Sequence, residues 1–431
     1  EGSDNKETIY EGNAGIELGG INRLLYAIKQ KSIKILISNN VNSDSRIIMY
    51  RNINERIRKI APFIEYDDNP YIVLNQDDGR LYWIIDGYTA SDKYPYSKPF
   101  SEEINLNYIR NSVKVVVDAY NGDVKYYIFD ETDPLIQTYR KIFPNLFLDK
   151  SEMPSGIMEH TRYPTTLFNI QADMYKTYHV SNPMVFYNEE DLWDIAQEKY
   201  MESVQSVEPT YLMFKLPEED FVEFLLTVPY TPKTKPNMSS LFVARNDGDD
   251  YGKLFIYKFP KGKTIDGPLM IESRIDQNTD ISEQLTLWSQ QGSKVLRGNV
   301  IIVPIENSLL YVEPIYLQAD NENSLPEMKR VIVAFRDDMI MAKSLDEALT
   351  KIFGETEIEA EPIQEEDIED DTEQEKTPEE IVDESTMELI KKATELFNNA
   401  KEASQEGNWA EYGKYIDELE KILNKLKTSS N

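Results

Sequence analysis

The sequence predicts an α+β fold in which mixed helices and antiparallel β hairpins form two lobes, followed by an acidic disordered tether and a C-terminal αα-hairpin. Strand-length apolar runs separated by turn residues are typical of β hairpins. Apolar side chains repeated at helical spacing indicate amphipathic helices among them. A long run of like charge separates this body from a last helical pair. We therefore predict a mixed α+β lobe at 1–150, a β-rich lobe at 151–354, an acidic linker at 355–384 and a helical hairpin at 385–431.

Composition and charge exclude several classes of protein. The chain has 431 residues, 40% of them hydrophobic, and a net charge of -31, which suffices for two or three domains with a sizeable core. Such acidity opposes binding to nucleic acid, and to anionic lipid head groups for the body as a whole. The absence of cysteine excludes disulfides and thiolate metal sites. No apolar run reaches membrane-helix length, and the polar start without methionine suggests that a segment upstream was removed.

The first lobe combines two amphipathic helices with two hairpins and a short third helix. Helical spacing predicts helices at 21–38 and 53–60. Apolar runs around turn residues predict hairpins that pair 71–74 with 81–85 and 113–120 with 124–129. In the second hairpin Asn121 and Gly122 predict a type I′ turn, in which both residues have positive φ. A third helix at 133–143 ends before Pro144.

The second lobe begins with an amphipathic helix and continues mainly as strands. The predicted strands cover 211–216, 221–228, 239–244, 253–259, 300–304, 309–317 and 329–335. Helices are expected at 281–291 and 344–353, where Ser344 and Glu347 form a capping box. Residues 355–384 hold sixteen acidic residues and one lysine, which predicts a disordered tether.

Four strings give the chain a specific resemblance. They are SRIIMYRNINERIRKIAPF (45–63), DGYTASDKYPYS (86–97), YPTTLFNIQADMYKTYHVSNPMVFYNEEDLW (163–193) and SEQLTLWSQQGSKVLRGNVIIVPIENSLLYVEPIYLQ (282–318). Together they resemble uncharacterised protein family (UPF) zero-one-eight-two, over roughly residues 8–354, and the last helical pair is similar to the common tail of that family.

The resemblance implies a subcellular location but no activity. It implies a bacterial plasma-membrane protein whose N-terminal half is a bundle of membrane helices, absent from this chain. The present region would be the large soluble part on the extracellular side. The family brings no established activity, so no functional residue is transferred to this sequence.

Candidate binding residues cluster in an aromatic segment and around the two histidines. Aromatic faces beside carboxylates suit a glycan or a peptide, although alternation along a strand would bury half of them. The candidates are Tyr82, Trp83, Asp86, Tyr88, Tyr94, Tyr96, His160, Arg162 and His179.

The two histidines also allow a metal site or an acid–base role. His160 and His179 could join Glu159, Glu190 or Asp191, since imidazole and carboxylate suit zinc. Nineteen residues separate the histidines and no HExxH spacing occurs. Structural histidines are therefore the favoured interpretation.

A loop rich in oxygen ligands suggests weak calcium binding. Asn246, Asp247, Asp249 and Asp250 fall within five residues, but the rest of an EF-hand is missing and turn chemistry also explains them. The string Lys261-Gly-Lys-Thr ends like a phosphate-binding loop, yet Tyr257 occupies the position of the first glycine. A β-turn between strands is the better interpretation of that string.

The favoured functional hypothesis is a non-enzymatic binding or assembly module. Its expected partners are other membrane or exported proteins or cell-wall polymer, with no nucleic acid and no cofactor other than calcium. One alternative is an exported hydrolase that acts on wall polymer or peptide through two carboxylates. Another is a chaperone-like helper, which would expose an apolar groove.

Overall fold

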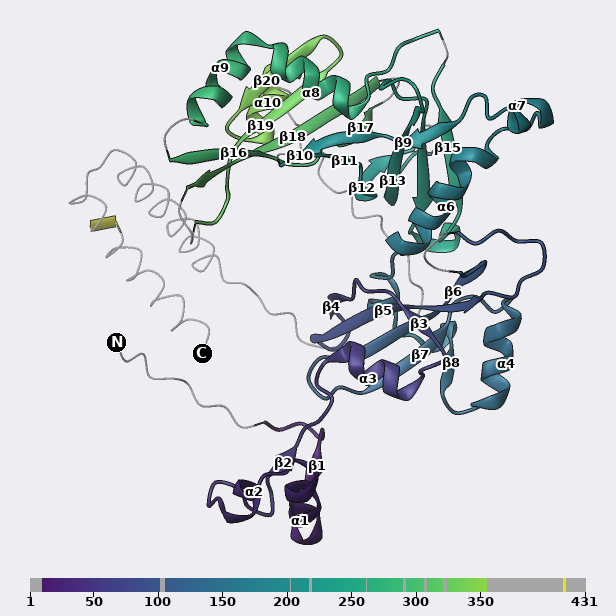
Figure 1. The fold of residues 1–431 in the computed structure, drawn as a ribbon. Coiled ribbons are helices and arrows are strands. Elements are labelled where there is room, and N and C mark those ends of the chain that lie inside the picture. Colours follow the sequence, from purple (N-terminus) through teal and green to yellow (C-terminus); the bar gives the residue numbers. More distant parts are fainter. Residues whose placement is uncertain are drawn as a thin grey trace, which may run out of the picture. The chain divides into compact units, whose positions relative to one another are not determined.

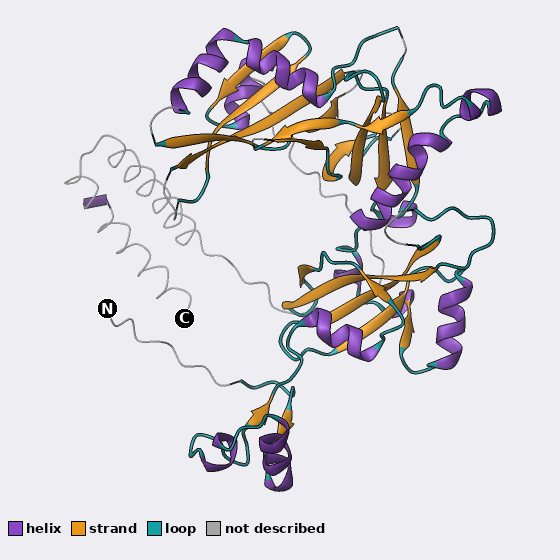
Figure 2. Cartoon of the chain, viewed as in Figure 1, coloured by secondary structure: helices purple, strands orange, loops and turns teal. Residues whose placement is uncertain are grey.

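The computed structural model describes residues 10–100, 105–201, 203–216, 219–260, 262–289, 292–305, 308–320, 324–354 and 414–415. Residues 1–357 form one compact unit and residues 358–431 a second. The described residues combine helices with mainly antiparallel sheets, which confirms the α+β prediction (Figure 2). Apart from residues 414–415, the predicted tether and helical hairpin lie outside the described residues. Both predicted lobes fall within the first unit, so their boundary at residue 150 stays a prediction.

The N-terminal segment is a small helical module closed by a two-stranded ribbon. Its elements are β1 (Ile16–Glu17), α1 (Gly20–Lys29), α2 (Lys34–Ile37) and β2 (Arg46–Ile47). One continuous helix over 21–38 was therefore wrong. Lys31 adopts a left-handed conformation, with φ of 51°, and the N–H groups of Lys31 and Ser32 bond back to the carbonyls of Ile28 and Ala27. This backbone arrangement ends α1 one turn before α2 begins.

A six-stranded sheet follows and forms the first half of the body (Figure 1). Its strands are β3 (Glu65–Tyr66), β4 (Tyr71–Asn75), β5 (Arg80–Ser91), β6 (Tyr108–Asp118), β7 (Val124–Ile128) and β8 (Phe147–Asp149). The main order is β3-β5-β6-β7-β8, and β4 also pairs with β5. Helices α3 (Ile53–Ile60) and α4 (Pro134–Ile142) contribute Ile57 and Ile136 to the buried cluster on one face of this sheet.

The hairpin of β6 and β7 is confirmed, but its turn differs from the prediction. The last strand pair is Val117 with Val124, and Gly122 is the one turn residue with positive φ, at 75°. The carboxylate of Asp118 accepts hydrogen bonds from the N–H groups of Tyr120 and Asn121. These bonds hold the start of the loop in a right-handed conformation, so the two-residue type I′ turn does not form.

Helix α6 (Thr165–Tyr178) leads from the first sheet to the rest of the body. It lies between short elements, which are η1 (Lys150–Glu152), α5 (Ser155–Met158) and α7 (Pro183–Tyr187). Phe168 of α6 stacks on Phe242 at a ring distance of 4.7 Å. The amphipathic helix predicted at the start of the second lobe is therefore confirmed, and its apolar face packs on the strand that contains Phe242.

Two five-stranded sheets and three helices complete the first unit. The second large sheet holds β9 (Trp193–Ile195), β12 (Thr210–Lys215), β13 (Val222–Pro232), β14 (Ser240–Arg245) and β15 (Leu254–Lys258). The third holds β16 (Ser293–Arg297), β17 (Ile301–Ile305), β18 (Ser308–Ala319), β19 (Glu327–Phe335) and β20 (Asp338–Ala342). The remaining elements are β10 (Gln197–Tyr200), β11 (Ser203–Ser206), η2 (Gly248–Asp250), α8 (Pro268–Gln277), α9 (Thr279–Trp288) and α10 (Leu345–Phe353).

One buried cluster joins the second and third large sheets. Val243 and Leu225 from the second sheet meet Ile302 and Ile332 from the third, and Ile271 of α8 lies among them. Every strand predicted in this lobe is present, and the prediction missed β9, β10, β11, β16 and β20 together with helices α5, α7 and α8. Ser344 caps α10, since its side chain accepts from the N–H of Glu347. The predicted capping box is only half formed, because the Glu347 carboxylate accepts from the N–H of Lys343 instead of that of Ser344.

Candidate functional site

A buried ion pair in the first sheet is the starting point of the site. Asp86 of β5 and Lys114 of β6 are paired residues in the antiparallel register. The Lys114 side chain is fully buried and its ammonium contacts the Asp86 carboxylate. It also donates to the carbonyl of Arg162 at 2.7 Å. A buried ammonium needs such partners, so this pair fixes the backbone of Arg162 against the sheet.

Aromatic rings lie close to the two cations of this site, Lys114 and Arg162. The Lys114 ammonium lies 5.6 Å from the ring of Phe129 and 5.4 Å from the ring of Tyr251. The Arg162 guanidinium lies 3.9 Å from the ring of Tyr71 and 4.9 Å from that of Tyr211. The electron-rich faces of the rings stabilise both cations, of which Lys114 is fully buried and Arg162 is half-buried.

Burial shifts the proton affinity of the acidic groups in this cluster. It raises the pKa of Asp86, and Lys114 opposes that shift. Burial, together with the carboxylates of Asp86 and Asp67, also raises the pKa of Tyr88. The Tyr88 hydroxyl donates to Asp67 at 2.5 Å. Tyr88 therefore stays protonated and acts as a donor.

The chain at Arg162 and Tyr163 is held from the second large sheet as well. Asn246 accepts from the N–H of Tyr163 at 2.5 Å, and Tyr211 donates to the carbonyl of Tyr163 at 2.5 Å. Tyr251 donates to the carbonyl of Arg162 at 3.0 Å. Hydrogen bonds thus connect the 162–163 segment both to strand β6 and to the loops around β14. We call Asp86, Lys114, Arg162, Tyr211, Asn246 and Tyr251 the junction cluster.

A cavity of about 780 Å³ lies beside the junction cluster. It is lined by Glu131, Lys150, Ser151, Met158, Glu159, Thr161, Asn246, Asp247, Gly248, Asp249 and Tyr251. Four carboxylates and one lysine give this lining a formal charge of -3. The junction cluster forms one wall through Asn246 and Tyr251, and that wall is rigid because both side chains are hydrogen-bonded to the 162–163 segment.

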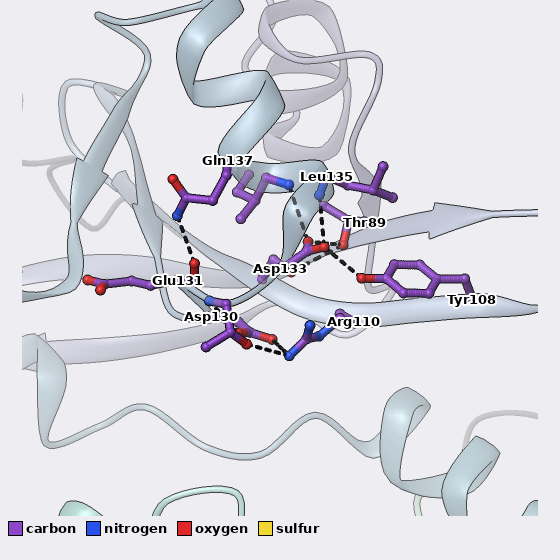
Figure 3. A network of polar contacts seen from close by, with 11 residues as sticks. Thr89, Tyr108, Arg110, Asp130, Glu131, Asp133, Leu135 and Gln137 are labelled. Carbon is purple, nitrogen blue, oxygen red and sulfur yellow. Dashed lines mark hydrogen bonds and ion pairs between the residues drawn. The ribbon is translucent and has the colours of Figure 1, made fainter. Parts of the chain in front are cut away.

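A network of polar contacts at the N-terminus of α4 (Figure 3) lies next to Glu131, which lines the cavity. Asp133 caps the helix and accepts from the hydroxyls of Thr89 at 2.5 Å and Tyr108 at 2.7 Å. Gln137 in the first turns of α4 donates to the carbonyl of Glu131 at 2.9 Å. Although burial opposes it, hydrogen bonds from Ser112, Thr89 and Tyr108 lower the pKa of Asp133. This network fixes the backbone from which the Glu131 carboxylate reaches the cavity.

The candidate binding residues of the aromatic segment divide between opposite faces of β5. Asp86 and Tyr88 lie in or beside the junction cluster, on the same face as Arg162. Tyr82 is half-buried and donates to Asp78 at 2.7 Å. Trp83 points to the opposite face, where it is half-buried and packs against the buried cluster that contains Ile57 of α3.

Tyr94 and Tyr96 lie apart from the junction cluster in the loop after β5. Tyr94 stacks on Tyr108 at a ring distance of 5.3 Å, and Tyr96 is exposed. The structure thus brings together Asp86, Tyr88 and Arg162 of the candidate residues and separates the others from them.

The two histidines have different surroundings. His160 is exposed just after α5. His179 ends α6, stacks on Trp193 at 3.7 Å and has ring nitrogens 3.2 Å and 3.0 Å from the carbonyls of Tyr175 and Asp191. Within the described part of the chain, no group of three or more histidine, aspartate or glutamate side chains is arranged to hold a metal ion.

Side chains of the candidate calcium loop are engaged with neighbouring protein groups. Asp250 forms ion pairs with Arg245 and Lys253. Asp247 accepts from the N–H of Phe224 at 2.7 Å, and Asn246 belongs to the junction cluster. Asp249 is exposed at the cavity. Calcium binding by this loop stays a prediction.

Sequence reasoning missed Lys114, Tyr251 and a buried group of carboxylates in the third sheet region. A lysine inside the run Val-Lys-Val-Val-Val was a usable signal, because a charge at the centre of an apolar strand needs a buried partner. Tyr251 carries no comparable signal, since tyrosines are common in this chain.

The carboxylate group consists of Glu198, Glu272 and Glu313, each almost fully buried. Arg297 pairs with Glu313 at 2.5 Å, and the N–H of Lys199 donates to both oxygens of Glu272 at 2.8 Å and 2.9 Å. Burial raises the pKa of all three, that of Glu272 to about 7. None of them lines the cavity beside the junction cluster.

None of the helices that the structure describes has the length and apolarity that a membrane crossing requires.

Comparison with known proteins confirms the resemblance. The sequence profile of the Uncharacterised protein family (UPF0182) matches residues 1–288. A UPF0182 protein of Alkaliphilus metalliredigens (strain QYMF) is 53% identical over 433 residues, covering 99% of this chain and 46% of that relative. One of Trichodesmium erythraeum (strain IMS101) is 46% identical over 448 residues, covering 99% and 47%. One of Methanospirillum hungatei JF-1 is 45% identical over 422 residues, covering 97% and 45%.

The chain spans about half the length of the curated relatives it matches. No solved structure is significantly similar to it. The profile match extends over well more than half of the sequence, and the relatives align along nearly all of it. The chain therefore belongs to the Uncharacterised protein family (UPF0182).

Proposed function

We propose that this region is a binding or assembly module that holds a positively charged segment of a partner protein in the cavity beside the junction cluster. The cavity itself carries the proposal, since its volume of about 780 Å³ is in the range of ligand sites. Its lining has a net charge of -3 and presents the aromatic side chain of Tyr251. Complementary charge gives such a site selectivity for lysine and arginine side chains.

The distribution of perturbed carboxylates favours binding over hydrolysis. Raised pKa values occur at Asp86, Glu198, Glu272 and Glu313. None of these groups lines the cavity, whereas a general acid must reach its substrate. The walls are rigid and hydrogen-bonded, which lowers the ordering cost of binding a flexible segment.

Charge removal in the cavity is expected to weaken binding of a labelled lysine-rich peptide. The variant Glu131→Gln/Glu159→Gln/Asp249→Asn keeps the shape of the exposed side chains and removes three charges. The expected loss is on the order of tenfold to a hundredfold in Kd, measured by fluorescence anisotropy in low salt. The matched control Asp320→Asn/Glu283→Gln/Asp337→Asn removes three exposed carboxylates outside the cavity and should change Kd less than threefold. Equal losses in both variants would show that only the overall charge of the chain attracts the peptide.

The proposed address is the extracellular side of the plasma membrane, beside membrane helices that lie outside this chain. The support is family membership together with the resemblance, which implies a membrane-bound N-terminal half. In intact cells of a bacterium that carries the whole protein, added protease is expected to degrade an epitope inserted at exposed Tyr96, and a cytoplasmic marker should survive. Protection of the epitope until the cells are lysed would place this region in the cytosol.

A further inference from the structure

We infer that the N-terminal module, residues 16–50, docks on an anionic lipid surface through the apolar faces of α1 and α2. The module has almost no core of its own, since Leu18 and Ala27 are its buried apolar residues. Seven large aliphatic side chains on α1, on α2 and at the N-cap of α2 are between 37% and 71% exposed, whereas Ile35 is half-buried. The seven are Ile21, Leu24, Leu25, Ile28, Ile33, Leu36 and Ile37.

These side chains form one stripe on each helix. In α1 the apolar positions follow the spacing i, i+3, i+4 and i+7. Ile33, the N-cap of α2, and Leu36 and Ile37 within it follow the spacing i, i+3 and i+4, which places each set on a single face. Arg23 fixes the two helices together, because its guanidinium donates to the carbonyls of Ile35 at 2.8 Å and Ser38 at 2.9 Å. The stripes are therefore held as parts of one preformed module.

The local charge identifies the partner as anionic. Residues 16–50 hold five basic and two acidic residues, a net charge of +3 in a chain of net -31. Arg46 pairs with Glu17. Lys29, Lys31 and Lys34 are exposed beside the stripes and form no ion pair with any described residue. Apolar faces flanked by lysines are the pattern of helices that lie in the interface of an anionic bilayer.

Two other occupants fit this surface less well. A symmetric contact with a second copy of the chain would place two modules of net charge +3 against each other, and like charges repel. The acidic segment 355–384 matches the charge, but its five large aliphatic residues are spread over thirty positions. It would neutralise the lysines without covering seven aliphatic side chains. A lipid interface satisfies both the charge and the apolar area.

Vesicle sedimentation with the full chain tests the inference. The protein is expected to sediment with phosphatidylglycerol-containing vesicles at low salt and to stay in solution with pure phosphatidylcholine vesicles. The charge variant Lys29→Gln/Lys31→Gln/Lys34→Gln should lower the partition coefficient on the order of a hundredfold, since each lysine contributes roughly fivefold. The apolar variant Ile21→Ser/Leu25→Ser/Ile28→Ser should lower it at least as much. The control Ile72→Ser/Leu74→Ser/Leu81→Ser removes three aliphatic side chains elsewhere that are 47–53% exposed, and it should leave the partition coefficient unchanged.

Several outcomes would overturn the inference. One is equal binding to neutral vesicles, and another is full binding by the apolar variant. Dimerisation in sedimentation velocity that the apolar variant abolishes, without vesicle binding, would assign the face to a second copy. Vesicle binding that appears only after removal of residues 355–431 would show that the acidic segment covers the face in the intact chain.

Discussion

Lys114→Met is expected to lower the free energy of unfolding of the body by about 3–5 kcal/mol, because it leaves a carboxylate buried without its cation. The methionine fills nearly the same volume, so a cavity contributes little to the loss. Asp86 then retains no opposite charge, and the carbonyl of Arg162 loses the donor that ties it to the first sheet. Urea unfolding followed by tryptophan fluorescence measures the effect as a change in the midpoint.

Two further variants test whether the loss of stability comes from the ion pair itself. Lys125→Met changes an exposed lysine on the neighbouring strand β7 and should alter stability by less than about 0.5 kcal/mol. The double variant Lys114→Met/Asp86→Leu removes both charges and should recover most of the loss, since no unpaired charge remains. A cost below about 1 kcal/mol for Lys114→Met alone would mean that Asp86 takes up a proton and the pair does not hold the junction.

Local patterns in the sequence predicted most of the elements but not where helices and turns break. The β6–β7 hairpin follows from alternating apolar runs around Asn121 and Gly122. Its turn conformation depends on the Asp118 carboxylate, which a two-residue turn rule does not consider. The break after α1 depends on Lys31 in a left-handed conformation, and propensity alone gives no reason to expect a lysine there.

The candidate site could be predicted only in part, since its members come from segments that are distant in the sequence. Asp86, Tyr88 and Arg162 stood out by residue type, and they do lie together. Lys114 joins them through the register of two strands, and Tyr251 through the packing of a loop on the 162–163 segment. Such contacts are fixed by tertiary structure, so neither periodicity nor motif spacing identifies them. The remaining aromatic candidates were chosen by the same rule and lie elsewhere.

The pH dependence of stability is expected to reveal the buried carboxylates of the third sheet region. Burial, helped by the negative charge of Glu313, raises the pKa of Glu272 to about 7 against the opposing effects of the Lys199 N–H and Arg297. An ordinary glutamate has a pKa of 4.5. Between these two values the folded state binds more protons than the unfolded state, so the free energy of unfolding falls as pH rises. Groups with a lowered pKa, such as Asp133, change the free energy of unfolding only at pH values below this range.

Glu272→Gln should therefore make the protein more stable than the parent at pH 8, by up to about 3 kcal/mol, and indistinguishable from it near pH 4. Glutamine keeps an oxygen that can accept from the N–H of Lys199 and removes the buried charge. Urea midpoints measured at half-unit steps from pH 4 to pH 8 give the difference between the two proteins, which isolates Glu272 from Glu198 and Glu313. The control Glu283→Gln alters an exposed carboxylate on α9 and should leave the pH profile of the parent unchanged. The opposite result is a Glu272→Gln variant whose free energy of unfolding changes with pH as steeply as that of the parent between pH 4.5 and 7. It would mean that the carboxylate of Glu272 is ionised throughout that range and that Arg297 compensates the buried charges of both Glu272 and Glu313.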